Sequence, residues 1–127
     1  MKPQVPETKE LPPLRASDFH VLLALVDGSL HGYAIMKAVE AGSAGRVRIE
    51  LGSLYRQVAR LLRTGLIEEA AGRENEPHAG RTRRSYRLTE RGRAAVREEV
   101  SRLRDTLASA EAKLSRAYRF RHRRPGT

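Results

Sequence analysis

An amphipathic segment near the middle of the chain, residues 49–69, places the strongest constraint on the fold. At 100° per residue its apolar side chains fall on one narrow stripe, formed by Leu54, Val58, Leu61 and Leu62. Its arginines fall on the opposite side: Arg56, Arg60 and Arg63. The pattern predicts a short helix from about Leu51 to Thr64, started at Gly52 and Ser53 and stopped by Gly65. One face of this helix is expected to pack and the other to present positive charge.

Two short strands with a long connection are expected after this helix. Residues 66–71 (LIEEAA) and 85–89 (SYRLT) are predicted strands, and Gly72, Pro77 and Gly80 indicate a loop between them, so the three pieces form a hairpin. A small basic helix that leads into such a hairpin is the order of a winged helix-turn-helix. In that fold the helix enters a DNA major groove.

The chain before the basic helix has room for two more helices. Ser17 is a good N-cap for a core helix that stops at Gly28. A second helix is predicted over residues 31–42, with His31 as its starting or turn residue. Apolar and charged side chains alternate over residues 46–50, which favours a brief strand leading into the basic helix.

The second strong signal lies after Thr89, an N-cap that begins a helix running to about Tyr118. Its apolar side chains are separated alternately by four and three residues, which is the period of a seam between two helices. The residues of this apolar seam are Val96, Val100, Leu103, Leu107, Ala110, Leu114 and Ala117. So small a domain leaves the seam no partner of its own, so we predict a homodimer.

The charge of +10 is unevenly distributed along the 127 residues. Residues 1–45 hold four basic and five acidic side chains, whereas residues 46–127 hold 21 basic and 10 acidic ones. The basic excess therefore begins where the amphipathic helix begins. Such an excess gives affinity for polyanions through counterion release, and double-stranded DNA is the expected partner.

Several classes of protein are disfavoured by composition. There is no cysteine, so disulfides and thiolate zinc sites are excluded, and His20, His31, His78 and His122 have no metal-like spacing. No Gly-rich phosphate loop or catalytic constellation is present, so neither an enzyme nor a cofactor is expected. The chain lacks an apolar run of membrane-spanning length and the apolar core of a signal peptide, which predicts a cytoplasmic protein without membrane contact.

Three motifs in this order resemble the PadR family of transcriptional regulators. They are HGYAI at residues 31–35, GSLYRQVARLLRTGLIEE at 52–69 and RRSYRLTERGR at 83–93. The resemblance covers about residues 14–118. It implies a winged helix-turn-helix followed by a C-terminal dimerisation helix, as in the shorter subgroup of the family. It also implies a repressor released by a small molecule or another signal, the effector itself being unidentified.

The expected fold is therefore mainly α with a small β-hairpin. Its parts are a flexible N-terminal arm (1–13), a winged helix-turn-helix DNA-binding domain (14–88), a dimerisation helix (89–118) and a basic tail (119–127). A two-fold dimer of this kind predicts an operator that is an inverted repeat.

The basic helix supplies most of the expected DNA contacts. Ser53, Arg56 and Gln57 are expected to face a groove, with Arg60 one turn further on. Arginine bonds bidentately to guanine and glutamine to adenine, while serine favours phosphate. For Tyr55 two roles stay open: the resemblance implies a hydroxyl that reaches the DNA backbone, and the alternative is a half-buried aromatic side chain closing the core.

The hairpin supplies three further expected contacts, Arg81, Arg83 and Arg84. Arg83 and Arg84 are neighbours on a strand and point to opposite sides, so one can reach a groove while the other pairs with a carboxylate.

Two alternatives to a sequence-specific regulator of this family remain. One is a winged-helix module that binds nucleic acid without sequence preference, or that binds another protein. The other, at the level of fold, is a MarR-like regulator, which differs in where its dimer helices pack.

Overall fold

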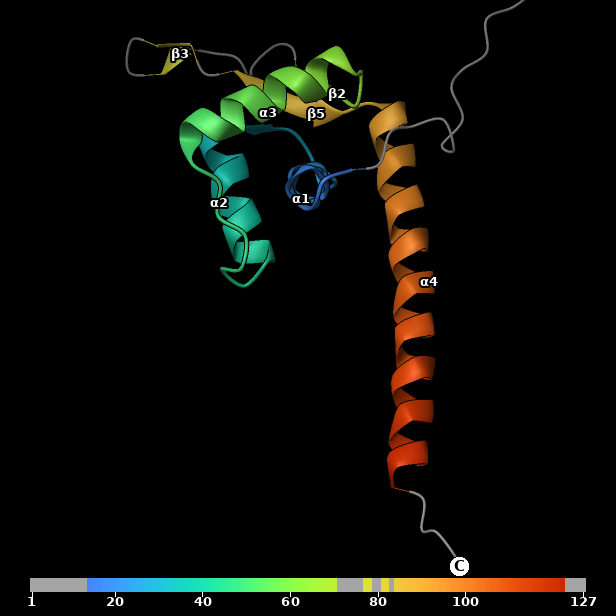
Figure 1. Ribbon diagram of the computed structural model, residues 1–127. Coiled ribbons are helices and arrows are strands. Elements are labelled where there is room, and N and C mark those ends of the chain that lie inside the picture. Colours follow the sequence, from blue (N-terminus) through green and yellow to red (C-terminus); the bar gives the residue numbers. More distant parts are fainter. Residues whose placement is uncertain (1–13, 71–76, 79–80, 83, 123–127) are drawn as a thin grey trace, which may run out of the picture.

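The computed structural model describes residues 14–70, 77–78, 81–82 and 84–122 (Figure 1). Three helices and a small sheet form one end of the molecule, and a long fourth helix extends far beyond them (Figure 1). The first three helices are α1 (Ala16–Ala24), α2 (Gly32–Gly42) and α3 (Leu51–Arg63). The fourth is α4 (Glu90–Arg121). The predicted N-terminal arm, residues 1–13, lies outside the described residues, as do residues 123–127 of the predicted tail.

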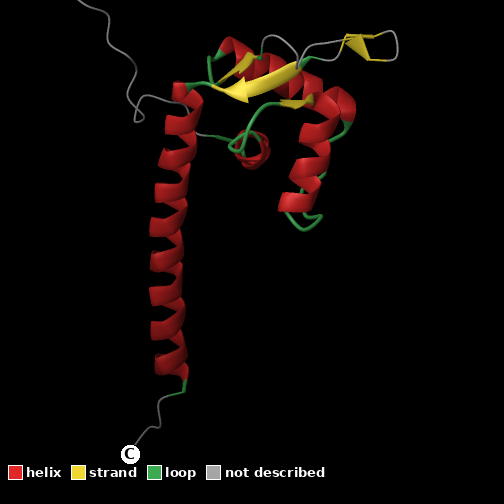
Figure 2. Ribbon diagram, turned by 180° about the vertical axis from the view of Figure 1, so that it is seen from behind, coloured by secondary structure: helices red, strands yellow, loops and turns green. Residues whose placement is uncertain are grey.

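The sheet is antiparallel and has three strands, in the order β1 (Leu30–His31), β5 (Ser85–Leu88) and β2 (Ile67–Glu69). β2 and β5 pair with Ile67 opposite Leu88, which confirms the predicted hairpin. Figure 2 shows this sheet lying beside α3, with α4 leaving from the end of β5. Between β2 and β5 the short strands β3 (Pro77–His78) and β4 (Arg81–Thr82) pair with each other.

The core is almost entirely aliphatic and is built where α1, α2, α3, the sheet and the start of α4 meet. Its buried members are Val21, Leu22, Leu25, Ile35, Val39, Leu54, Val58, Leu61, Leu66, Ile67, Tyr86, Leu88, Ala95 and Val96. Three of the four stripe residues of α3 are among them, and Leu62 packs against the cluster from its edge. The predicted packing face of α3 is confirmed.

The strand predicted over residues 46–50 is wrong. These residues run in irregular structure from α2 to α3, and the first strand of the sheet lies earlier, at β1. Val47 and Ile49 still pack against the core, so their alternation reflects burial. The Val47 N–H donates to the hydroxyl of Ser43 at 2.8 Å, which satisfies an amide that a strand would have paired with a neighbouring strand.

The predicted N-cap residues are confirmed for two helices and wrong for two. His31 begins α2, with a ring nitrogen accepting from the Ala34 N–H at 3.3 Å, and the Thr89 hydroxyl caps α4 by accepting from the Gly92 N–H at 3.0 Å. α1 begins one residue before Ser17 and ends at Ala24, short of the predicted stop. α3 begins at Leu51, as predicted, but its N-cap is Glu50 and not Gly52 or Ser53.

The first turns of α4 belong to the core of the chain itself. Ala95 and Val96 are buried in the core cluster, Val100 packs against that cluster, and α4 contacts α1. The apolar seam predicted to start at Val96 is therefore wrong at its first residue, because Val96 is already buried within the same chain, whereas Val100 is only partly buried. The remaining seam residues, Leu103, Leu107, Ala110, Leu114 and Ala117, are exposed. α4 also continues to Arg121, three residues into the predicted basic tail.

The start of α4 is bonded to the turn that ends α3. The Thr89 hydroxyl donates to the Gly65 carbonyl at 2.6 Å, and the Arg91 Nε donates to the Thr64 carbonyl at 3.0 Å. Gly92 lies so close to Leu66 that a Cβ there would be 2.0 Å from the Leu66 carbonyl oxygen. The direction in which α4 leaves the domain is thus fixed relative to α3.

Candidate nucleic-acid interface

The outer face of α3 carries polar and aromatic side chains near the start of the helix. Tyr55 and Arg56 are exposed, and Ser53 is half-buried beside them. Arg56 Nη2 donates to the Ser53 hydroxyl one turn earlier, at 3.1 Å. This bond is exposed and involves a neutral acceptor, so water or a ligand can replace it at little cost. The guanidinium of Arg56 is therefore available for a ligand at this face.

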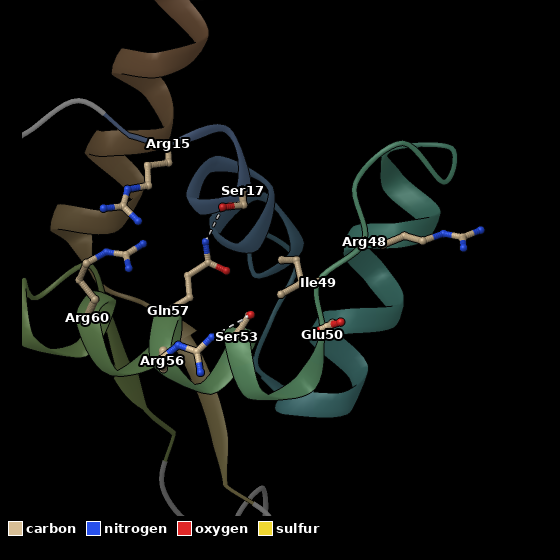
Figure 3. Close-up of a pocket in the computed structure, with 9 residues that line it drawn as sticks. All are labelled: Arg15, Ser17, Arg48, Ile49, Glu50, Ser53, Arg56, Gln57 and Arg60. Carbon is tan, nitrogen blue, oxygen red and sulfur yellow. Dashed lines mark hydrogen bonds between the residues drawn. The ribbon is translucent and has the colours of Figure 1, made fainter.

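An open hollow of about 530 Å³, here called the α3 groove, lies between α3, the start of α1 and the segment before α3. Its lining residues are Arg15, Ser17, Arg48, Ile49, Glu50, Ser53, Arg56, Gln57 and Arg60. Figure 3 shows the side chain of Arg15, the residue before α1, extending toward Arg60 of α3, while Arg48 points away from both. Of its four arginines, Arg48 pairs with Glu40 and Arg60 with Asp18. The surface still has an excess of positive charge, which suits an anionic partner.

The side chain of Gln57 is turned toward α1, so the expectation that it faces a groove of DNA is wrong. It is only 6% exposed, and its Nε2 donates to the Ser17 hydroxyl and to Asp18 Oδ1, both at 2.7 Å. Both amide hydrogens are used within the chain (Figure 3 draws the bond to Ser17). The sequence carried a signal for this position, because residue 57 lies three after Leu54 and four before Leu61, on the packing stripe.

Asp18 is the functional candidate that the sequence did not reveal. Its residue is 5% exposed, and its carboxylate lies against α3, where Arg60 Nη2 donates to Oδ1. The Arg60 side chain keeps 31% of its surface exposed and lines the α3 groove. An aspartate in the first turn of a helix is commonplace, since it favours the helix N-terminus. Only the packing of α1 against α3 brings it to Arg60, 42 residues later.

Tyr55 lies over Gly32, so two of the sequence motifs meet in space. A Cβ at Gly32 would be 3.0 Å from the Tyr55 hydroxyl oxygen and 3.2 Å from Cε1. The tyrosine nevertheless remains 50% exposed. One side of the ring thus packs on the start of α2, and the other faces solvent beside Arg56. A Cβ at position 32 would require the ring to shift by a few tenths of an ångström.

The hairpin strands carry two exposed ion pairs. Arg84 Nη1 lies 2.8 Å from Glu69 Oε2, and Arg87 Nε lies 2.9 Å from Glu68 Oε2. Of the adjacent residues Arg83 and Arg84, Arg84 is therefore one that pairs with a carboxylate. Arg83 lies outside the described residues, and only the backbone of Arg81, in β4, is described.

Tyr86 precedes Arg87 on β5, and its side chain is buried in the core. Burial raises the pKa of the Tyr86 hydroxyl above its usual value, and the nearby Glu69 carboxylate raises it further. The Tyr86 hydroxyl is therefore neutral at physiological pH.

The described part of the chain has neither a candidate metal site nor a membrane-spanning helix. Within residues 14–70 and 84–122 no three histidine or acidic side chains lie close enough together to hold a metal ion. None of the helices in these ranges combines the length and the apolar character needed to cross a membrane.

Three helices, of which α3 has an exposed basic face, and a three-stranded antiparallel sheet with a hairpin define a winged helix-turn-helix protein, as predicted. Residues 21–98 match the transcriptional regulator PadR-like family, and the chain belongs to that family. The family consists of transcriptional regulators, not enzymes.

Solved structures of similar proteins agree with this assignment. A transcriptional regulator from Clostridium thermocellum superposes with a TM-score of 0.61 at 25% identity, covering 75% of this chain and 86% of that one. Bacillus subtilis PadR, solved in complex with operator DNA, superposes with a TM-score of 0.60 at 19% identity, covering 69% of this chain and 48% of that one.

A curated relative is closer in sequence. It is an uncharacterized 37.1 kDa protein in transposon TN4556 of Streptomyces fradiae, 40% identical over 115 residues, which cover 78% of this chain. The chain spans about a third, 31%, of the length of that relative.

Proposed function

We propose that this chain is a dimeric, sequence-specific DNA-binding regulator that acts as a repressor and is released by a small molecule or another signal. The observation that carries the proposal is the start of α3, where Ser53 and Arg56 line the basic α3 groove and Tyr55 is exposed. In winged-helix proteins this helix is the one that enters the major groove. Repression and its release rest on family membership.

Arg56 is the proposed base-reading residue. Its guanidinium is exposed and gives up only a bond to a neutral hydroxyl, so it can bond both acceptors of a guanine. Ser53 and Tyr55 lie beside it and offer hydroxyls suited to phosphate oxygens. Arg81, Arg83 and Arg84 of the hairpin are proposed to contact the backbone or minor groove. For Arg84 this requires exchanging its exposed partner Glu69, which costs little.

The proposed dimer uses the free part of the apolar seam on α4. Leu103, Leu107 and Leu114 are 47%, 57% and 70% exposed, although they lie on one stripe of a helix. Such a stripe on a helix that projects beyond its own domain is suited to pairing with a second copy. A two-fold pair presents two α3 helices, so the proposed operator is an inverted repeat.

One observation favours a second candidate, a winged-helix module that binds DNA without sequence preference. Of the polar side chains expected to contact bases, Gln57 and Arg60 are bonded within the chain. Fewer side chains then remain to distinguish one sequence from another.

Measuring affinity for a selected and for a random DNA duplex across a salt series separates the two candidates. The duplex is first selected by the purified protein from a random pool. A sequence-specific regulator is expected to bind the selected duplex on the order of 10³-fold or more tightly than the random one at physiological salt. A ratio near one with a steep salt dependence would instead establish the non-specific module.

A further inference from the structure

Asp18 accepts three hydrogen bonds, two from side chains of α3 and one from the backbone at the start of α1. Its Oδ1 accepts from Gln57 Nε2 at 2.7 Å and from Arg60 Nη2, while its Oδ2 accepts from the backbone N–H of Arg15 at 3.4 Å. Asp18 is buried, and all three of its partners line the α3 groove. Within the described residues, every buried side-chain nitrogen or oxygen has a hydrogen-bond partner, so this arrangement is fully satisfied.

We infer that Asp18 is a specificity-determining positioning residue, which withholds Arg60 and Gln57 from DNA and leaves base recognition to Arg56. The inference rests on the proposed function of the α3 face. It assigns different roles to two arginines that lie four residues apart on one helix, Arg56 as a DNA contact and Arg60 as a charge retained by the protein.

The physical basis is the unequal cost of moving the two guanidinium groups. Arg60 donates a charge-assisted bond to a buried carboxylate, and losing it would leave Asp18 partly unpaired away from water. Arg56 donates to an exposed, neutral hydroxyl of Ser53. A phosphate therefore competes easily for Arg56 and poorly for Arg60.

Charge neutralisation has a second effect on the groove. The Asp18 carboxylate cancels part of the positive potential of Arg60 at the wall of the α3 groove. Non-specific binding is almost wholly electrostatic. A weaker positive potential therefore lowers the sequence-independent part of the affinity more than it lowers the part that comes from base-specific contacts. Asp18 thereby widens the difference between specific and non-specific DNA.

Asp18→Asn tests the inference, since asparagine keeps the shape and an acceptor oxygen but removes the charge. We expect a higher affinity for random duplex DNA, a salt slope steeper by about 0.9, which corresponds to one added phosphate contact, and a lower ratio of specific to non-specific affinity. The matched control is Asp27→Asn, which removes the same charge from an exposed position beyond α1. Equal behaviour of the two variants would overturn the inference.

A second pair of variants does not require Asp18 to be replaced. Arg60→Met should leave the salt slope on random DNA unchanged, whereas Arg56→Met should reduce it by about 0.9. Equal reductions in both variants would overturn the inference while leaving the proposed function intact. Failure of the unaltered protein to bind any duplex would overturn the proposed function, and the inference with it. Circular dichroism of each variant confirms that the helices are retained.

Discussion

Replacing Gly92 by alanine tests how α4 is joined to the end of α3. A Cβ at this position would lie 2.0 Å from the Leu66 carbonyl oxygen and 3.1 Å from its carbonyl carbon, where ordinary contact begins at 3.4 Å. The Leu66 oxygen is not free to move aside, because it accepts a bond of 3.2 Å from the Thr89 N–H. α4 must therefore shift away from the turn, and the bonds that Thr89 and Arg91 make to it are strained or lost.

The expected cost is a net loss of about 2 kcal/mol in the free energy of unfolding. Overpacking costs about 1–3 kcal/mol, and contact with backbone places Gly92→Ala in the upper part of that range. The helix preference of alanine over glycine returns about 0.5–1 kcal/mol. For a chain of this size the melting temperature should fall by roughly 6–10 °C.

Thermal unfolding followed by circular dichroism measures the change, with all proteins at one concentration because assembly adds to the apparent stability. The matched control is Gly52→Ala, in the first turn of α3, where the nearest atom is a terminal nitrogen of the Arg56 side chain at 3.9 Å. That control should be slightly stabilised. A Gly92→Ala protein as stable as the unaltered one would refute the close packing of α4 on Leu66.

Two further substitutions test the proposed DNA and dimer surfaces. Arg56→Ala should weaken binding to the selected duplex by about 1–3 kcal/mol more than binding to random DNA, measured by fluorescence anisotropy; equal losses would reduce Arg56 to a phosphate contact. Leu107→Glu should convert the dimer to monomer in sedimentation at micromolar concentration, because it sets two like charges together in the apolar seam. Ala112→Glu, on the opposite side of α4, should leave the dimer intact, and identical sedimentation of both variants would contradict the seam.

Apolar periodicity was sufficient to predict α2, α3 and α4, because burial of one stripe is decided by residues close together in sequence. The N-caps His31 and Thr89 are also predictable from the nearby sequence, because each side chain accepts a hydrogen bond from the amide three residues ahead. The prediction of a strand over residues 46–50 is wrong because a strand, unlike a helix, needs a partner from elsewhere in the chain. The alternation of apolar and charged residues shows which side chains are buried and does not show whether the backbone pairs with another strand. Here the Val47 N–H donates to the Ser43 hydroxyl instead.

The errors at Gln57 and Val96 share a different cause. Helical spacing says which residues share a face and leaves open what packs on that face. Gln57 is covered because α1 brings Asp18 to it, and Val96 is covered because α4 starts against α1. Both contacts join segments far apart in the chain, so no local pattern contains them.

The central claim, a rigid two-fold dimer that places two α3 helices on one face of DNA, is tested most directly by the spacing of the selected operator. Half-site centres should lie about 10 base pairs apart or a whole multiple of that distance. Inserting about five base pairs between the half-sites turns one of them to the opposite face of the duplex. We expect affinity to fall toward the value for random DNA and to recover in part after insertion of a full turn. Unchanged affinity after the half-turn insertion would contradict the account, because each subunit would then bind alone.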